Sequence, residues 1–168
     1  MKRRKFFFSR NRFLIFSLIA LAVIIADRIL KGIIMEMLPF ESFPLIGEIV
    51  YINFVQNTGG GFGILKGSSA VITWLSVILL GMILYFYDSL KERMRTLASS
   101  ALIFGGVCGN LIDRYSYGFV ADFIDFRFFP VFNLADSAIT IGAILLAFFM
   151  LFPEKRRGKN NKKNKKKR

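Results

Sequence analysis

Apolar residues fill four long runs along the chain, and shorter polar stretches separate them. The runs cover residues 13–35, 70–87, 97–111 and 134–152. A helix needs about 20 apolar residues to cross the hydrocarbon of a bilayer, which is about 30 Å thick. The pattern therefore predicts an all-α membrane protein with four transmembrane helices.

The connection between the first two runs departs from this helical pattern. Residues 49–55 (Ile-Val-Tyr-Ile-Asn-Phe-Val) are rich in strand formers, and Gly59-Gly60-Gly61 then interrupts the pattern. We expect a small extracytoplasmic β region here, lying on the outer membrane surface. The connection at residues 112–133 is rich in phenylalanine, which suits the boundary between lipid headgroups and acyl chains.

The basic residues give the orientation of the four helices. The formal net charge is +13, and nineteen of the 24 Lys and Arg residues lie in three segments, at residues 1–12, 91–95 and 153–168. An even number of crossings separates these segments, and basic residues accumulate on the cytoplasmic side of a membrane. Both ends of the chain are therefore expected to be cytoplasmic, and residues 36–69 and 112–133 to face outward.

The same distribution divides the chain into three parts. Residues 1–12 are expected to form a basic cytoplasmic N-terminus, 13–152 the four-helix membrane domain, and 153–168 a disordered polybasic cytoplasmic tail. A polybasic segment next to a membrane span favours anionic lipid headgroups, so membrane lipids are the expected partner of this charge and nucleic acid is not.

The absence of histidine restricts the possible chemistry. Without histidine the chain has no Ser-His or Cys-His nucleophile pair, and most zinc sites are excluded. The single cysteine, Cys108, lies among small residues in an apolar run and is interpreted as a packing residue. We expect no metal and no cofactor, so the chemistry falls to carboxylates, lysines, hydroxyls and amides.

Asp27 and Lys31 are two charges inside the first apolar run. They are four residues apart and so share one face of the predicted helix. Charged residues within a membrane span are costly and are functional candidates by default. The alternative is a structural pair that anchors the outer end of the helix, and the sequence leaves both interpretations open.

Two further clusters of acids face outward. Asn110 and Asp113 share a face if the third helix extends that far, and Asp122 follows them in a Phe-rich stretch. Asn133 is a candidate N-cap of the last helix, with Asp136 in its first turn, where the helix dipole favours a carboxylate.

Asp122 and Asp136 are placed at the same membrane face by this topology. Two carboxyl groups held together in a partly dry site share one proton, which provides one base and one acid. That pair can activate water and protonate a carbonyl oxygen or a leaving amine, which is the chemistry of an aspartyl hydrolase.

Two other functions compete with this one. A Ser–Lys peptidase would use a serine such as Ser42, Ser68 or Ser69 with Lys31 or Lys66, but no motif organises them. A small transporter would use Asp27, Lys31 and Asp113 as an ion pathway. Transporter folds often carry internal repeats, and the four apolar runs show none.

Five short motifs together resemble bacterial lipoprotein signal peptidase, also called signal peptidase II. They lie at residues 27–31, 57–62, 109–114, 120–123 and 132–137 and follow one another in the order of that family. The resemblance implies an intramembrane aspartyl endopeptidase of the bacterial cell (inner) membrane. It would remove signal peptides from diacylglyceryl-modified prolipoproteins, cutting before the lipidated cysteine, with no cofactor and with sensitivity to the cyclic peptide globomycin.

The resemblance also assigns roles to residues. The catalytic dyad falls on Asp122 and Asp136, and Asp113 is the rival for one dyad position. The remaining matched positions are expected to bind substrate or support the site: Asn57, Gly59, Asn110, Asp113, Arg114, Asn133, Asp27 and Lys31.

Overall fold

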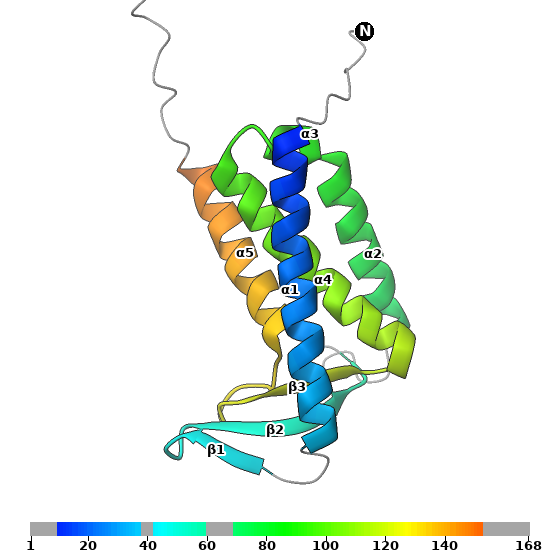
Figure 1. Cartoon of the computed structure of the whole chain (residues 1–168), viewed down its shortest axis with the longest axis vertical. Helices are drawn as coiled ribbons and strands as arrows, with labels where there is room; N and C mark the ends of the chain where they lie inside the picture. The colour runs from blue at the N-terminus through cyan, green and yellow to red at the C-terminus, as the bar shows by residue number, and fades with distance from the viewer. Residues whose placement is uncertain (1–9, 38–41, 60–68, 153–168) are drawn as a thin grey trace, which may run out of the picture.

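The structure is a computed structural model that describes residues 10–37, 42–59 and 69–152. Figure 1 shows a helical bundle with a small sheet across one end. The predictions for residues 1–9, for Gly60 and Gly61, and for the polybasic tail lie outside the described residues. So do Lys66 and Ser68 of the Ser–Lys alternative.

Five helices form the bundle in the described part of the chain: α1 (Arg10–Met37), α2 (Ser69–Tyr85), α3 (Tyr87–Leu90), α4 (Met94–Tyr117) and α5 (Leu134–Leu151). Three of these described helices, α1, α4 and α5, are long and apolar enough to cross a membrane. The helix α2 is also apolar but has 17 residues. Because α4 extends to Tyr117 rather than ending near Leu111, it carries the whole polar motif at residues 109–114.

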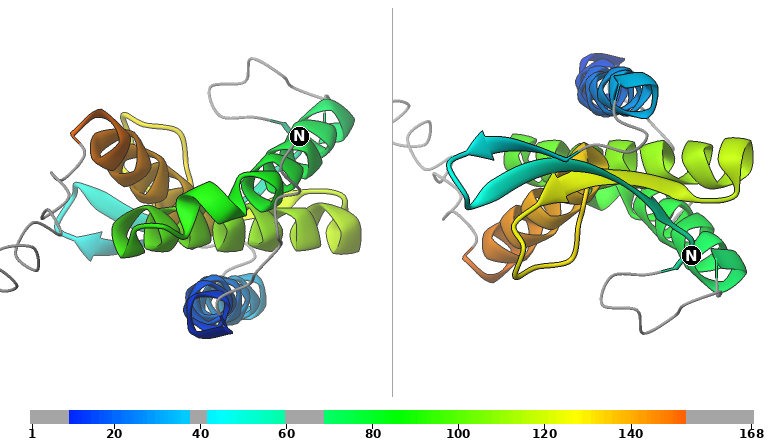
Figure 2. Two further views of the ribbon diagram at one scale, coloured as in Figure 1. Left: turned by 90° about the horizontal axis from the view of Figure 1, so that it is seen from above. Right: turned by 90° about the horizontal axis from the view of Figure 1, so that it is seen from below.

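The helix α4 lies at the centre of the bundle and packs against α1, α2 and α5. Figure 2 shows α1 on one side of α4, with α2 and α5 diverging from each other on the other side. Glycines allow the closest approaches. A Cβ added at Gly106 would lie 2.4 Å from the backbone oxygen of Ala135 on α5, and one at Gly105 would lie 2.7 Å from Ala20 O on α1. Small residues allow such close helix contacts in membrane proteins.

The sheet has three antiparallel strands in the order β1 (Ser42–Ile46), β2 (Val50–Asn57) and β3 (Val120–Asp125). The prediction of a β region near residues 49–55 is confirmed. The strand β3 was not predicted, because its phenylalanines indicated an interfacial loop. Burial explains the difference: five of the six β3 residues are buried, and the strand packs against β2, α1 and α4, so this segment forms part of the core.

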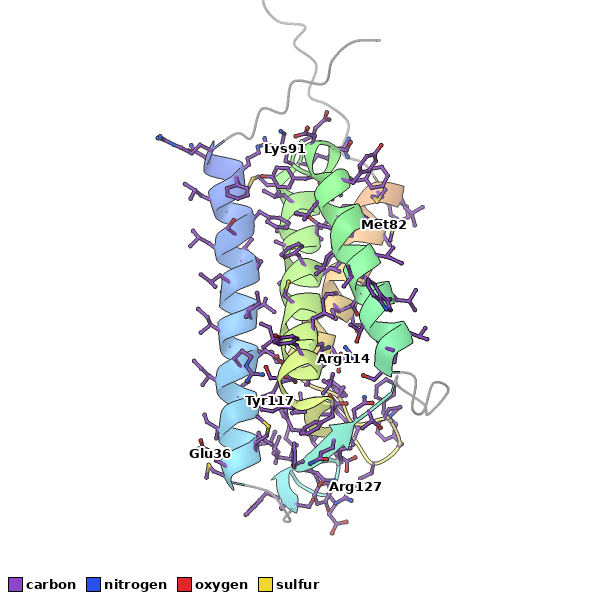
Figure 3. All side chains as sticks on the ribbon, turned by 90° about the vertical axis from the view of Figure 1, so that its right-hand side faces the viewer. Glu36, Met82, Lys91, Arg114, Tyr117 and Arg127 are labelled. Atoms are coloured by element: carbon purple, nitrogen blue, oxygen red, sulfur yellow. The ribbon has the colours of Figure 1, made fainter. Side chains whose placement is uncertain are left out.

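The sheet and the helix ends next to it form one end of the molecule. The first residues of α1 and the last residues of α5 lie at the opposite end, together with α3 (Figure 1). Figure 3 shows Arg114 near the sheet end of α4 and Lys91 at the far end. The acidic motifs of the sequence are therefore collected where the helices meet the sheet.

Candidate active site

The carboxyl group of Asp122 is buried on β3, with only 1% of the residue exposed. Its neighbours come from two other elements. Asn57, at the end of β2, donates from Nδ2 to Asp122 Oδ2 over 2.8 Å. Asn133, at the start of α5, donates from Nδ2 to Asp122 Oδ1 over 2.6 Å. The pairing of Val55 with Asp122 in the β2–β3 ladder brings the end of β2 to this carboxyl group.

Asp136 lies in the first turn of α5 and takes part in a capping box with Asn133. The Asn133 side-chain oxygen accepts from Asp136 N over 2.8 Å, and Asp136 Oδ2 accepts from Asn133 N over 3.3 Å. The prediction of Asn133 as the N-cap is confirmed. Asn110 on α4 donates from Nδ2 to the other carboxyl oxygen, Oδ1 of Asp136, over 2.7 Å. Both oxygens of Asp136 are thereby held in position.

Asn133 connects the two acids directly. Its Nδ2 donates to Asp122 and also to Asn110 Oδ1 over 3.1 Å, while its Oδ1 accepts from the backbone of Asp136. The residue is completely buried. A single asparagine therefore fixes Asp122, on the sheet, relative to Asp136, on a helix.

The surroundings of Asp122 favour its protonated form. Burial, and secondly the nearby Asp136, raise the pKa of Asp122 from 3.8 to about 7, against the opposing hydrogen bonds from Asn57 and Asn133. A group with this pKa is about half protonated near neutral pH. The pair can therefore hold one proton and one negative charge, and each titration step belongs to the pair.

Lys31 is the centre of a buried ion cluster beside the two acids. Its Nζ lies 2.7 Å from Asp27 Oδ2 and 2.8 Å from Asp113 Oδ2, and it donates to Asn110 Oδ1 over 2.9 Å. All three charged residues have no exposed surface. Asp27 and Lys31 are therefore an ion pair within α1, and the pair reaches α4 as well.

Each carboxylate of the cluster also holds a piece of backbone. Asp27 Oδ1 accepts from Ala135 N over 2.9 Å, one residue before Asp136. Asp113 Oδ2 accepts from Ala121 N over 3.1 Å, one residue before Asp122. The cluster thus holds in position the two chain segments that carry Asp122 and Asp136.

Asp113 differs from Asp122 and Asp136 in what surrounds it. It shares Lys31 with Asp27, pairs through Oδ1 with Arg28 and is fully buried. Arg28 also donates to the hydroxyl of Tyr117 over 3.0 Å. The two oxygens of Asp113 are therefore occupied by cations and a backbone amide.

A cavity of about 580 Å³ opens beside Asp122 and Asp136. Apolar residues of α2, α4, α5 and the loop at residues 129–132 form most of its wall. Its polar end is formed by Asn57, Asn110, Arg114, Asp122 and Asp136. Lys31, Asp27 and Asp113 are not part of the lining, so among the described acids it is Asp122 and Asp136 that a molecule in this cavity would meet.

Two more of the residues that the sequence analysis expected to support the site, Gly59 and Arg114, contribute to this polar end. Gly59 N donates to Asn57 Oδ1 over 2.9 Å, which leaves the Asn57 amide nitrogen directed at Asp122. Arg114 lines the cavity, and its Nη1 donates to Asn110 O over 3.4 Å. It is a cation that lines the same cavity as the two acids.

The structure adds residues to the network that the sequence did not single out. Arg28 pairs with Asp113, and Gly109 leaves room for Asp27, since a Cβ there would lie 2.8 Å from Asp27 Oδ2. The sequence could have indicated Arg28, because it is a third charge inside the first apolar run. The role of Gly109 depends on how α1 and α4 pack. Within the described residues, no three Cys, Asp or Glu side chains lie close enough together to hold a metal ion.

Comparison with known proteins identifies the relatives of this chain. A family model described as signal peptidase (SPase) II matches residues 19–152. The lipoprotein signal peptidase of Halothermothrix orenii is 42% identical over 140 residues, covering 82% of this chain and 96% of the relative. That of Syntrophomonas wolfei is 44% identical over 146 residues, covering 83% and 95%. A solved bacterial membrane enzyme superposes with a TM-score of 0.78 at 34% identity, covering 86% of this chain and 92% of that one.

Proposed function

Because the chain belongs to the signal peptidase II family, whose members are membrane proteases that cleave signal peptides from prolipoproteins, we propose that Asp122 and Asp136 are its catalytic acids. One observation carries the proposal. Both carboxyl groups line the same cavity, and both are bonded to Asn133, which sets their relative position. The raised pKa of Asp122 supports a pair that shares one proton at neutral pH.

The two acids divide the work of hydrolysis in this proposal. Asp136 carries the negative charge, because the backbone N–H groups of a helix N-terminus stabilise a carboxylate there. It removes a proton from a water molecule, which attacks the scissile carbonyl carbon. Asp122 carries the shared proton and gives it to the developing oxyanion, and proton return to the leaving amine completes cleavage. Arg114 and Asn110 border this space and favour negative charge in it.

The buried cluster holds the acids in position without taking part in proton transfer. Asp27 and Asp113 bond the amides of Ala135 and Ala121, the residues immediately before the two acids. Lys31 is engaged by both carboxylates, so it is not available as the base of a Ser–Lys pair. The same contacts argue against an ion pathway, because Arg28 pairs with Asp113 as well and the two cations balance the two carboxylates in a closed cluster.

The substrate of this proposal is a prolipoprotein whose cysteine already bears a diacylglyceryl group. Purified protein in detergent is expected to cut such a substrate immediately before that cysteine, and globomycin is expected to block the reaction by occupying the cavity. Mass spectrometry of the products identifies the bond that is cut. Cleavage at another bond, or cleavage that globomycin leaves unchanged, would contradict this substrate assignment.

We further propose that α2 is a fourth span and that the sheet faces outward. The exposed apolar side chains along α2 and the nineteen basic residues in three segments support this topology. A reporter that is active only outside the cytoplasm is expected to be inactive when fused after Phe152 and active when fused at Gly67. The reverse pattern would place the two acids on the cytoplasmic side and refute the assignment.

Cleavage rate against pH is expected to be bell-shaped. The pair works with one negative charge, so activity falls at low pH as that charge is lost, and falls again above about 7 as Asp122 gives up the shared proton. Asn133→Ala removes the helix cap of Asp136 and a hydrogen bond that lowers the pKa of Asp122. Both limbs should therefore move to higher pH, by several tenths of a unit for a helix-end effect of about 0.3–1 kcal/mol.

A second substitution separates these two effects. Asn133→Ser keeps an oxygen that can accept from Asp136 N but removes the amide that donates to Asp122. Its acidic limb should stay in place while its basic limb moves up. If the acidic limb of a well-folded Asn133→Ala protein does not move, the helix terminus is not what stabilises the charge.

A further inference from the structure

The cavity beside the two acids has a second part, which the proposed reaction does not use. From the polar end it continues between α2 and α5, where Ile72, Val107 and Ile139 form its wall. Ile141 lines the cavity and is also 53% exposed, so the cavity opens onto the exposed apolar side of α5, which would face lipid. Figure 2 shows α2 and α5 diverging on this side of α4.

Hydroxyl groups interrupt this apolar wall. Ser76 on α2 and Thr140 on α5 both line the cavity, and neither hydroxyl makes a hydrogen bond within the described parts of the chain. Hydroxyls in a helix are usually satisfied by the backbone. Thr73 on α2 bonds Ser69 O over 2.8 Å, and Ser137 on α5 bonds Asn133 O over 3.0 Å. Ser76 and Thr140 therefore each have a hydroxyl group that can donate a hydrogen bond to a molecule in the cavity.

The chemistry of these hydroxyls selects the kind of occupant. A hydrocarbon chain has no acceptor, so two donors in its path would each lose a hydrogen bond in an apolar setting. A helical signal peptide satisfies its own backbone acceptors. An ester carbonyl is an acceptor without a donor, and it needs a partner when it leaves water. Among the parts of a lipidated prolipoprotein, the ester groups of the glycerol match two unpaired donors in an apolar wall.

The depth of Thr140 agrees with this chemistry. It lies four residues after Asp136, which places it about 6 Å further along the axis of α5. In a cysteine that carries a diacylglyceryl thioether, seven bonds separate the scissile carbonyl carbon from the nearer ester oxygen. At the rise of an extended chain, that path spans about 8 Å. A scissile bond at the two acids thus brings an ester group to the level of Thr140.

We propose that Ser76 and Thr140 bind the ester carbonyls of the diacylglyceryl group, so that the cavity recognises the ester linkage as well as the acyl chains. This inference rests on the proposed function, because the distance is measured from a scissile bond at Asp122 and Asp136. It assigns two specificity-determining residues outside the polar site. They contribute to substrate binding, while the proton transfers stay with the two acids.

The test compares two synthetic substrates in detergent free of glycerolipids. Both carry one peptide sequence, with a cysteine that bears either two acyl esters or two alkyl ethers of equal length. For the double variant Ser76→Ala with Thr140→Val, the KM of the ester substrate is expected to rise about 5–30-fold, the loss expected for two neutral hydrogen bonds. Its kcat should stay within about twofold of the wild-type value, since the reacting groups are untouched.

The ether substrate distinguishes recognition from packing. It lacks the carbonyls, so its KM should already be high for the wild-type protein and should not rise further in the double variant. Thr140→Ser, which keeps the hydroxyl, should retain most of the affinity for the ester. Thr73→Val removes a hydroxyl of α2 that is bonded to its own helix and does not line the cavity, and it should leave both substrates unaffected.

Two results would overturn the ester subsite while leaving the proposed function intact. One is an equal rise of KM for both substrates, which would indicate lost packing. The other is an unchanged KM for the ester substrate in the double variant. If the wild-type protein cuts neither substrate, the proposed function itself fails, and the subsite fails with it.

Discussion

Asp122→Asn and Asp136→Asn are each expected to abolish cleavage of a lipidated prolipoprotein while leaving the protein folded in the membrane. Asparagine keeps the size of the side chain but cannot exchange the proton that the pair shares. General acid–base catalysis contributes about 10²–10⁴-fold for each participating group, so the loss should reach the detection limit of a gel or mass-spectrometric assay. The measurement is the initial cleavage rate of purified variants at equal concentration.

Asp125→Asn is the matched control for these substitutions. Asp125 is a buried carboxylate on the same strand as Asp122, but it bonds the backbone of Arg127 and does not line the cavity. This variant should keep most of its activity. Asp113→Asn should retain partial activity, because an asparagine oxygen can still accept from Ala121 N although the ion pairs are lost. An inactive Asp113→Asn together with an active Asp122→Asn would show that the dyad is assigned to the wrong residues.

The pH dependence of stability offers an independent check on Asp122. Its pKa is raised in the folded protein, so between about pH 4 and 7 the folded state binds more protons than the unfolded state. Stability should therefore fall as pH rises through this range. Thermal unfolding in detergent should show a smaller fall for Asp122→Asn than for the wild-type protein. Equal falls would mean that Asp122 does not carry the raised pKa.

Lys31→Met is expected to destabilise the protein by about 3–5 kcal/mol, because it leaves two buried carboxylates without their shared cation. Activity should be lost as well, since Asp27 and Asp113 hold the backbone next to both acids. Thermal unfolding in detergent measures the first effect. Lys91→Met is the matched control. Its pair with Asp88 is partly exposed, and removing it should cost less than about 1 kcal/mol.

A second substitution tests the electrostatic reason. Asp113 keeps Arg28 when Lys31 is lost, whereas Lys31 is the cation that pairs with Asp27 in the described part of the chain. Adding Asp27→Asn to Lys31→Met should therefore recover part of the lost stability, because asparagine can still accept from Ala135 N. A double variant less stable than Lys31→Met would show that the cost arises from packing and not from an unpaired charge.

The positions of the helices could be predicted from the sequence because their cause is local. The apolar runs had to leave water, and each predicted its helix to within three residues at both ends, except that α4 continues to Tyr117, beyond the apolar run that ends at Leu111. The capping box at Asn133 and Asp136 was also predictable, because it depends on side chains three residues apart. The same holds for the ion pair of Asp27 and Lys31, which lie four residues apart on α1.

What the sequence could not determine depends on contacts between distant segments. It offered Asp113 as a rival to Asp122, and only the fold shows Asp113 enclosed by Lys31 and Arg28. It predicted a loop at residues 120–125, and the pairing with β2 makes this segment a strand. The packing of α1, α4 and the sheet encloses Asp113 in the ion cluster and leaves Asp122 and Asp136 at the cavity. Residues as far apart in the chain as Asp27 and Ala135 meet there, and no local pattern records such a contact.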